Sequence, residues 1–235
     1  MAISPGLCTI CVRAGSKGVA GKNTRLMHGR PLLAYSIEHA KRCDLFDCIA
    51  VSSDSTEILE VALAYGADVA VHRPADLATD VAAKLPAIRH CAEAVEKQTS
   101  VQYELFVDLD VTSPLREAGD IVGAVNELLE SGSGNVITGT PAHRSPYFNM
   151  VERQADGTIA LCKPLQKRVL RRQDAPQCFD MNASIYVWRR KAFFDGPFVF
   201  SNDTRIFVMP PERSIAIDDE LDWDLVEFLM GRRGT

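Results

Sequence analysis

Three glycines and three cations are crowded into the segment RAGSKGVAGKN, residues 13–23, directly after the apolar run LCTICV. Glycines let backbone N–H groups approach an anion closely, and neighbouring cations neutralise its charge. The segment therefore predicts a phosphate-binding loop, with a flexible basic turn as the alternative. Its spacing fits neither common nucleotide motif. Asn23 stands where a Walker A loop needs a hydroxyl, and the glycines read G-x-x-G-x-x-G, unlike a dinucleotide fingerprint.

Carboxylates and further cations stand directly after other apolar runs. If those runs are parallel strands, their carboxyl ends meet at one edge of a sheet and the side chains face one crevice. A magnesium ion takes one or two carboxylates besides phosphate oxygens, and Asp110 and Asp218 are the better candidates. Asp54 and Asp219 are expected to cap helices, and Asp108 is equally well explained as a solvated acid. The residues at this edge are Ser53, Asp54, Arg73, Asp108, Asp110 and Asp218.

The elements that must position these side chains alternate through the first two thirds of the chain. Strands are expected at Leu7–Val12, Cys48–Ser53, Asp68–His72, Glu104–Asp110 and Val136–Thr140. Helices are expected at Pro31–Lys41, from a cap at Asp54 to Gly66, at Ala83–Glu96 and at Ala118–Glu130. Such alternation predicts an α/β fold with a mainly parallel sheet and helices on both faces.

The alternation is interrupted after Pro141. Strands without intervening helices are expected at Phe148–Val151, Ile159–Cys162 and Ile185–Trp188. The run KPLQKRVLRRQ carries five cations and no acid. A strand-like stretch at Ser214–Ile217, a strand at Arg205–Met209 and an amphipathic tail at Leu221–Met230 then resume the pattern. We predict one domain over residues 1–235, with residues 141–179 inserted into it as an arm.

The overall composition excludes several classes of protein. A net charge of −5 and a pI near 5.6 disfavour bulk nucleic-acid binding, and no apolar run approaches a membrane span. The N-terminus lacks the basic region of a signal peptide, so a cytoplasmic location is expected. Seven cysteines, an odd number, without metal-ligand spacing predict reduced structural thiols.

Six motifs, in order along nearly the whole chain, carry a resemblance to a known family. They are VRAGSKGVAGKN, VSSDS, HRPADLATD, LDVTSPLR, FDMNASIYVW and SIAIDDELD, of which TSPLR is the most specific. Together they resemble the cytidylyltransferase family that makes CMP-sialic acids. The resemblance implies a Rossmann-like nucleotidyltransferase fold. It also implies a reaction in which the anomeric hydroxyl of a nine-carbon 2-keto-3-deoxy sugar acid attacks the α-phosphate of CTP and pyrophosphate leaves.

The resemblance also implies roles for individual residues. Arg13 and Lys22 would act on the phosphates, Asp218 would bind Mg²⁺, and Asp110 would contact the sugar or the metal. Arg172 would bind the carboxylate of the sugar acid. The remaining implied contacts are Gly15, Ser16, Asn23 and Arg73 to the nucleotide and Asn182 to the sugar. The inserted segment matches an arm through which two subunits exchange contacts, so a homodimer is expected and Arg172 would serve the partner's site.

Departures from the sialic-acid enzymes gather around the sugar rather than the nucleotide. Asp110 replaces a glutamine of those enzymes, and Ala216 replaces the first aspartate of a D-I-D motif. Lys84 replaces a serine, Asp180 replaces an arginine, and the sequence of Arg144–Glu152 differs. These departures favour relatives that activate legionaminic acid. Three alternatives stay open: an octulosonate cytidylyltransferase, a glycosyltransferase with Asp108-Leu109-Asp110 as its metal motif, and a non-catalytic nucleotide-binding module.

Overall fold

The computed structural model describes residues 5–15, 18–79, 81–167, 169–196 and 199–233. Its centre is a seven-stranded sheet in the order β11-β7-β10-β6-β1-β4-β5. Every neighbouring pair is parallel except the two pairs that β10 makes with β6 and β7. The strands are β1 (Gly6–Cys11), β4 (Cys48–Ser53), β5 (Val69–His72), β6 (Leu105–Leu109), β7 (Asn135–Pro141), β10 (Phe179–Arg189) and β11 (Arg205–Val208). The predicted mainly parallel α/β fold is confirmed.

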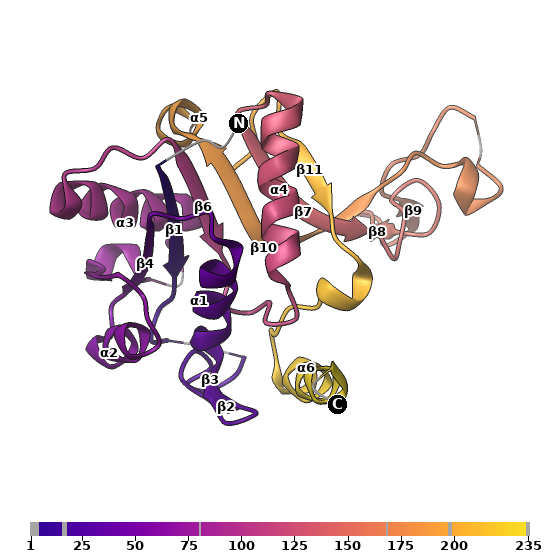
Figure 1. Ribbon diagram of the computed structural model, residues 1–235. Helices are drawn as coiled ribbons and strands as arrows, with labels where there is room; N and C mark the ends of the chain where they lie inside the picture. The colour runs from indigo at the N-terminus through magenta and orange to yellow at the C-terminus, as the bar shows by residue number, and fades with distance from the viewer. Residues whose placement is uncertain (1–4, 16–17, 80, 168, 197–198, 234–235) are drawn as a thin grey trace.

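Helices cover both faces of this sheet because successive strand side chains point to opposite sides. Within β1, Cys8 and Ile10 join one apolar core, whereas Leu7 joins the other. The first core takes side chains from α1 (Leu32–Cys43), α2 (Thr56–Ala64), α4 (Ala118–Ser131) and α6 (Glu220–Arg233). The second takes them from α3 (Lys84–Thr99) and α5 (Arg190–Asp195). Figure 1 shows α4 and α1 over one face of the sheet, with α6 near its lower end.

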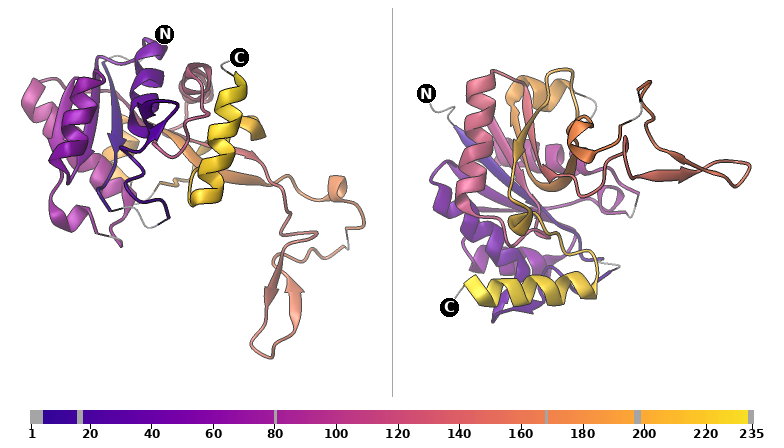
Figure 2. Two further views of the ribbon diagram at one scale, coloured as in Figure 1. Left: turned by 90° about the horizontal axis from the view of Figure 1, so that it is seen from below. Right: turned by 90° about the vertical axis from the view of Figure 1, so that its right-hand side faces the viewer.

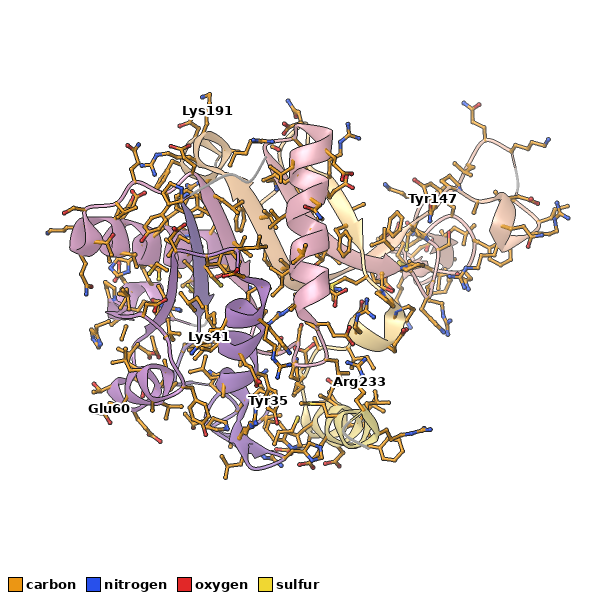
Figure 3. The ribbon with its side chains drawn as sticks, viewed as in Figure 1. Tyr35, Lys41, Glu60, Tyr147, Lys191 and Arg233 are labelled. Atoms are coloured by element: carbon orange, nitrogen blue, oxygen red, sulfur yellow. The ribbon has the colours of Figure 1, made fainter. Side chains whose placement is uncertain are left out.

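Short elements complete the fold. β2 (Leu26–Met27) and β3 (Arg30–Pro31) form a small hairpin before α1, and a 3-10 turn spans Ala75–Leu77. Two further 3-10 turns lie at Arg172–Asp174 and Pro211–Arg213. At the end of the chain, Arg233 of α6 donates a 2.7 Å hydrogen bond to the carbonyl of Leu115, which ties the helix to the loop after β6 (Figure 3). No helix within the described residues is long and apolar enough to cross a membrane.

Residues 142–178 leave the sheet between β7 and β10 as an arm (Figures 1 and 2). β8 (Val151–Arg153) pairs antiparallel with β9 (Ile159–Leu161), and most side chains of both strands are exposed. Tyr147 lies on this arm in Figure 3, and the Lys163 ammonium sits 5.8 Å from its ring centre. In the turn between β8 and β9, the Gly157 N–H donates to the Gln154 carbonyl at 3.0 Å.

Several predicted boundaries are wrong for identifiable reasons. α2 is capped by Ser55, whose hydroxyl accepts from the Ile58 N–H, because Asp54 instead accepts from the Ala14 N–H at 2.8 Å. Residues 214–217 form no strand, although the Ile217 N–H donates to the Thr112 carbonyl. The strand expected at Phe148–Val151 begins only at Val151, since residues 148–150 fold back on Ser145. Helix α5 was not predicted.

Candidate active site

The glycine loop packs directly against the chain that carries Asp218. A Cβ built on Gly18 would lie 1.7 Å from the Asp218 carbonyl oxygen, so only glycine fits there. The Lys22 ammonium donates a 2.7 Å hydrogen bond to the Ile217 carbonyl. Two segments that lie 195 residues apart in the sequence are thereby held together, and the exposed Asp218 directly follows the residue whose carbonyl Lys22 binds. Ser16 and Lys17, on the same loop, lie outside the described residues.

The start of the loop is fixed by buried polar contacts. Asn23 is 9% exposed, and its side-chain amide donates to the Arg13 carbonyl at 2.9 Å. The backbone carbonyl of Asn23 accepts from the Leu33 N–H. Asn23 therefore fixes the backbone just after β1, where Arg13 lies. Gly15 is exposed, and a Cβ built there would meet no atom within 4 Å.

A cavity of about 260 Å³ opens beside this loop at the carboxyl ends of β1, β5 and β6. It gathers three cations and one carboxylate. Arg73 is 5% exposed, and its guanidinium is oriented by the Ser52 hydroxyl at 3.3 Å and the Ser52 carbonyl at 2.9 Å. The lining residues are Cys11, Arg13, Arg73, Leu77, Thr79, Ala82, Ala83, Lys84, Ala87 and Asp110.

Lys84 joins two carboxylates at one wall of this cavity. Its ammonium lies 2.8 Å from Asp110 Oδ2, 3.2 Å from Asp108 Oδ2 and 4.8 Å from the centre of the Tyr186 ring. Asp108 Oδ1 accepts from the Thr9 hydroxyl at 2.9 Å. Burial opposes the charge on Lys84, but the two carboxylates raise the pKa of its ammonium well above the ordinary value.

The pKa values of the two carboxyls shift in opposite directions, although Lys84 favours ionisation of both. Asp108 is completely buried, and burial raises the pKa of its carboxyl despite Lys84 and Thr9. Burial also opposes ionisation of Asp110, yet Lys84 and the N–H and hydroxyl of Thr112 hold the pKa of that carboxyl well below its ordinary value. Lys84 is therefore a charged member of the site. The sequence had marked it only as a departure from the family pattern.

A second cation that sequence reasoning missed, Arg116, supports this wall from behind. It is 1% exposed, and burial lowers the pKa of its guanidinium to about 10. It donates to the carbonyls of Asp110 at 3.1 Å and Ser184 at 2.8 Å, and to the Ser36 hydroxyl at 2.8 Å. The signal for Arg116 was the specific string TSPLR. For Lys84 it was a lysine in the first turn of a helix, where a cation needs a compensating partner.

Of the three residues predicted to contact the sugar, Asp110 lines this cavity, whereas Asn182 and Arg172 are not among its lining residues. The amide of Asn182 accepts from the Thr138 hydroxyl at 2.7 Å and donates to the Ser214 hydroxyl at 3.0 Å, so it joins β7, β10 and the segment before Asp218. Arg172 lies on the arm, where it donates to the Ala142 carbonyl and lines a cavity of about 550 Å³ together with Arg144. The arm that carries Arg172 projects away from the sheet (Figure 2), and no residue of the glycine loop lines its cavity.

The basic run of the arm is less isolated than the sequence suggested. Arg171 forms an ion pair with Asp174, its Nε lying 2.9 Å from Asp174 Oδ2, and this acid follows directly after the run. Arg168 lies outside the described residues.

The two carboxylates predicted as metal ligands differ in how well they fit. Asp110 Oδ1 accepts twice from Thr112, and Asp110 Oδ2 is paired with the Lys84 ammonium, whose positive charge would repel a metal ion at that oxygen. Asp218 is exposed and adjoins Lys22, and it suits Mg²⁺ that is shared with phosphate oxygens. No group of three metal-ligating side chains exists among residues 5–15, 18–79, 81–167, 169–196 and 199–233.

Comparisons with known proteins agree with this geometry. Residues 7–211 match the family described as Cytidylyltransferase. The chain is 42% identical to the "Post-translational flagellin modification protein B" of Campylobacter coli and 43% identical to the "CMP-N,N'-diacetyllegionaminic acid synthase" of Campylobacter jejuni. Each alignment covers 95% of this chain and 94% of the relative. The chain belongs to the cytidylyltransferase family. The predicted family is thereby confirmed, and the chain is an enzyme of this class.

More distant relatives of this cytidylyltransferase place its fold. It is 28% identical to the "N-acylneuraminate cytidylyltransferase" of Escherichia coli over 93% of this chain and 50% of that protein. A solved CMP:2-keto-3-deoxy-manno-octonic acid synthetase, complexed with CTP, covers 98% of this chain and is itself covered completely, with a TM-score of 0.70 at 15% identity. That likeness establishes the Rossmann-like nucleotidyltransferase fold and nothing further.

Proposed function

We propose that this enzyme transfers CMP from CTP to the anomeric hydroxyl of a nonulosonic acid of the legionaminic type. The hydroxyl oxygen bonds to the α-phosphorus, the bond to the bridging oxygen of the β-phosphate breaks, and pyrophosphate leaves while the hydroxyl proton is released. The observation that carries the proposal is the contact of the glycine loop, through Gly18 and Lys22, with the Asp218 segment.

The nucleotide would lie across this contact. Backbone N–H groups around Gly15 and the cations Arg13 and Lys22 would bind the phosphates, because phosphoryl transfer depends mostly on positioning and charge neutralisation. Arg73, held rigid by Ser52, would contact the cytidine in the cavity of about 260 Å³. Asn23 would act indirectly, by holding the carbonyl of Arg13.

Asp218 would hold Mg²⁺ together with phosphate oxygens of the bound nucleotide. The ion would offset the charge that develops as pyrophosphate leaves. Lys22, which is anchored to the carbonyl of the preceding residue Ile217, would stabilise charge on the leaving phosphates. We assign Asp110 a different role, because Lys84 and Thr112 already occupy its oxygens.

The sugar acid would bind between two subunits of a homodimer. Arg172 lines the arm cavity, and arginine binds a carboxylate bidentately. Asn182 would shape the sugar side of the site through its bonds to Thr138 and Ser214. The legionaminic type is favoured by identity, which is 43% to a legionaminic acid synthase and 28% to an N-acylneuraminate enzyme. A cytoplasmic location fits this substrate chemistry and stays a prediction.

Two rival functions are disfavoured by particular observations. A glycosyltransferase would use Asp108 and Asp110 as metal ligands, but Lys84 bridges them and Asp108 is fully buried. A non-catalytic module would not need Lys22 and Asp218, and this chain holds both side by side. The octulosonate cytidylyltransferase shares the fold, and no contact described above favours it.

Pyrophosphate release with each of the four nucleoside triphosphates tests the proposed donor and metal residue. We expect release with CTP in the presence of Mg²⁺ and far less with ATP, GTP or UTP. Asp218→Asn should abolish it, whereas Asp219→Asn should retain it, because asparagine can replace the helix-capping Asp219 that accepts from the Asp222 N–H. Equal rates with a purine nucleotide, or an active Asp218→Asn variant, would contradict the proposal.

A further inference from the structure

The wall formed by Lys84 and Asp110 has one donor and one acceptor to spare. A lysine ammonium carries three N–H groups. Lys84 uses one in the hydrogen bond to Asp110, and its ammonium also forms an ion pair with Asp108 at 3.2 Å. Asp110 Oδ1 accepts twice from Thr112, but Oδ2 accepts only from Lys84, and a carboxylate oxygen has two lone pairs. Within the described residues, one N–H of Lys84 and one lone pair of Asp110 Oδ2 therefore have no partner.

Exposure shows that these spare groups face the cavity. The side chain of Lys84 is 30% exposed and that of Asp110 is 27% exposed, whereas Asp108 is completely buried. Lys84 and Asp110 line the same cavity as Arg13 and Arg73, and Asp108 anchors the lysine from beneath.

The pair is also rigid. The Asp110 carbonyl accepts from Arg116 at 3.1 Å and from Ser36 at 3.2 Å, and its N–H donates to the Ser184 carbonyl at 3.1 Å. The Tyr186 ring lies against the Lys84 ammonium. A donor and an acceptor held this firmly, a few ångströms apart, form a preorganised binding element.

The charge of this wall indicates which group it would bind. Lys84 is already paired with Asp110 and Asp108, so its charge is compensated, and the phosphates would bind at Arg13 and Lys22 instead. A hydroxyl both accepts and donates, which matches one lysine N–H and one carboxylate lone pair. We propose that Lys84 and Asp110 together bind one ribose hydroxyl of the nucleotide and so select a ribonucleotide over its deoxy analogue.

This inference rests on the proposed function, which supplies the nucleotide, and deepens it. Calorimetry with CTP, 2′-deoxyCTP and 3′-deoxyCTP, without sugar acid, isolates the nucleotide from any sugar hydroxyl. We expect the wild-type protein to bind one of the two deoxy analogues about tenfold more weakly than CTP. Lys84→Met and Asp110→Asn should lose most of that ratio. Lys97→Met, an exposed lysine on the same helix α3, should keep it.

Folding is monitored alongside, because Lys84→Met leaves the buried Asp108 without its cation. The double variant Lys84→Met/Asp108→Asn removes that unpaired charge and should also lose the discrimination. A wild-type protein that binds CTP and both analogues equally, or variants that keep the full ratio, would overturn this proposal while the proposed function stands. A wild-type protein that binds no CTP at all would overturn both.

Discussion

At the scale of single residues, the ammonium of Lys22 is held where the phosphates of a bound nucleotide are expected. Its hydrogen bond to the Ile217 carbonyl fixes it beside Asp218. We predict that Lys22→Ala lowers kcat/KM for CTP by about a hundredfold or more, because a preorganised cation at the reacting phosphates is lost. Steady-state pyrophosphate release measures this.

A matched lysine provides the control for that variant. Lys191 lies on α5, at the top of Figure 3, and pairs only with Asp195 among the described residues. Lys191→Ala should leave kcat/KM unchanged. A Lys22→Ala enzyme with near-normal turnover would show that Lys22 only braces the loop.

A buried histidine gives the molecule a predictable dependence on pH. Burial, with Arg116, Arg42 and Arg233 nearby, lowers the pKa of His39 from 6.5 to about 3. The unfolded chain therefore binds a proton below pH 6.5 that the folded chain refuses until about pH 3. The free energy of unfolding should therefore decrease as the pH decreases across this window, by at most about 1.4 kcal/mol per pH unit from this group.

Urea unfolding of the wild type and of His39→Gln between pH 7 and about 4 measures this contribution. Glutamine does not titrate, so the variant should show a shallower loss of stability as the pH falls. Parallel curves for the two proteins would mean that His39 becomes protonated in the folded state.

At the scale of elements, the contact between the glycine loop and the segment of Asp218 depends on one missing side chain. Gly18→Ala would place a methyl group against the Asp218 carbonyl, with 1.7 Å available. One of the two segments must then move, so we expect a loss of about 1–3 kcal/mol in stability and a larger loss in activity. Gly15→Ala, in the same loop, meets no atom within 4 Å and should keep the wild-type melting temperature.

The parallel part of the sheet was readable from the sequence, whereas the contacts within the site were not. Apolar runs such as Cys48–Ser53 are buried on both faces, which gives a clear local signal. The sequence predicted only Ile185–Trp188 of the long strand β10. This strand runs antiparallel to its neighbours and contains a bulge, where Ala183 adopts a φ of 52°. The bridge from Lys84 to Asp108 and Asp110 depends on tertiary packing, which no spacing along the chain reports.

Local capping signals also misled where a tertiary contact was stronger. Asp54 resembled a helix cap, but its carboxylate holds the Ala14 N–H of the glycine loop, and the adjacent Ser55 caps α2 instead. Asn182 was predicted from a motif to contact the sugar, and that contact stays a prediction. Its amide is used to join two strands and the Ser214 segment, a role that only the fold defines.

At the scale of the whole molecule, the arm raises the question of where Arg172 acts. The arm projects from the sheet (Figures 1 and 2). Its cavity is lined by Arg172 and Arg144 and by no residue of the glycine loop. We predict that Arg172→Ala raises KM for the sugar acid at least about tenfold and leaves KM for CTP nearly unchanged. The reason is that arginine would bind the carboxylate of the sugar and not the nucleotide.

Mixing two inactive proteins tests whether Arg172 serves the partner's site. In a mixed dimer of Lys22→Ala and Arg172→Ala subunits, one site would hold both residues intact, so part of the activity should return. Subunit exchange is verified by mass spectrometry of tagged chains. If exchanged dimers stay inactive, Arg172 acts within its own chain or outside the site.

The central claim is that this enzyme joins CMP to a legionaminic-type acid, and identification of the product tests it most directly. The protein is incubated with CTP, Mg²⁺ and, separately, N,N'-diacetyllegionaminic acid, N-acetylneuraminic acid or 3-deoxy-manno-octulosonic acid, and the products are analysed by mass spectrometry. We predict that the CMP-sugar forms in equal amount to pyrophosphate, and fastest with N,N'-diacetyllegionaminic acid. The account would be contradicted if neither nine-carbon acid yields a CMP-sugar, or if only the octulosonic acid yields one.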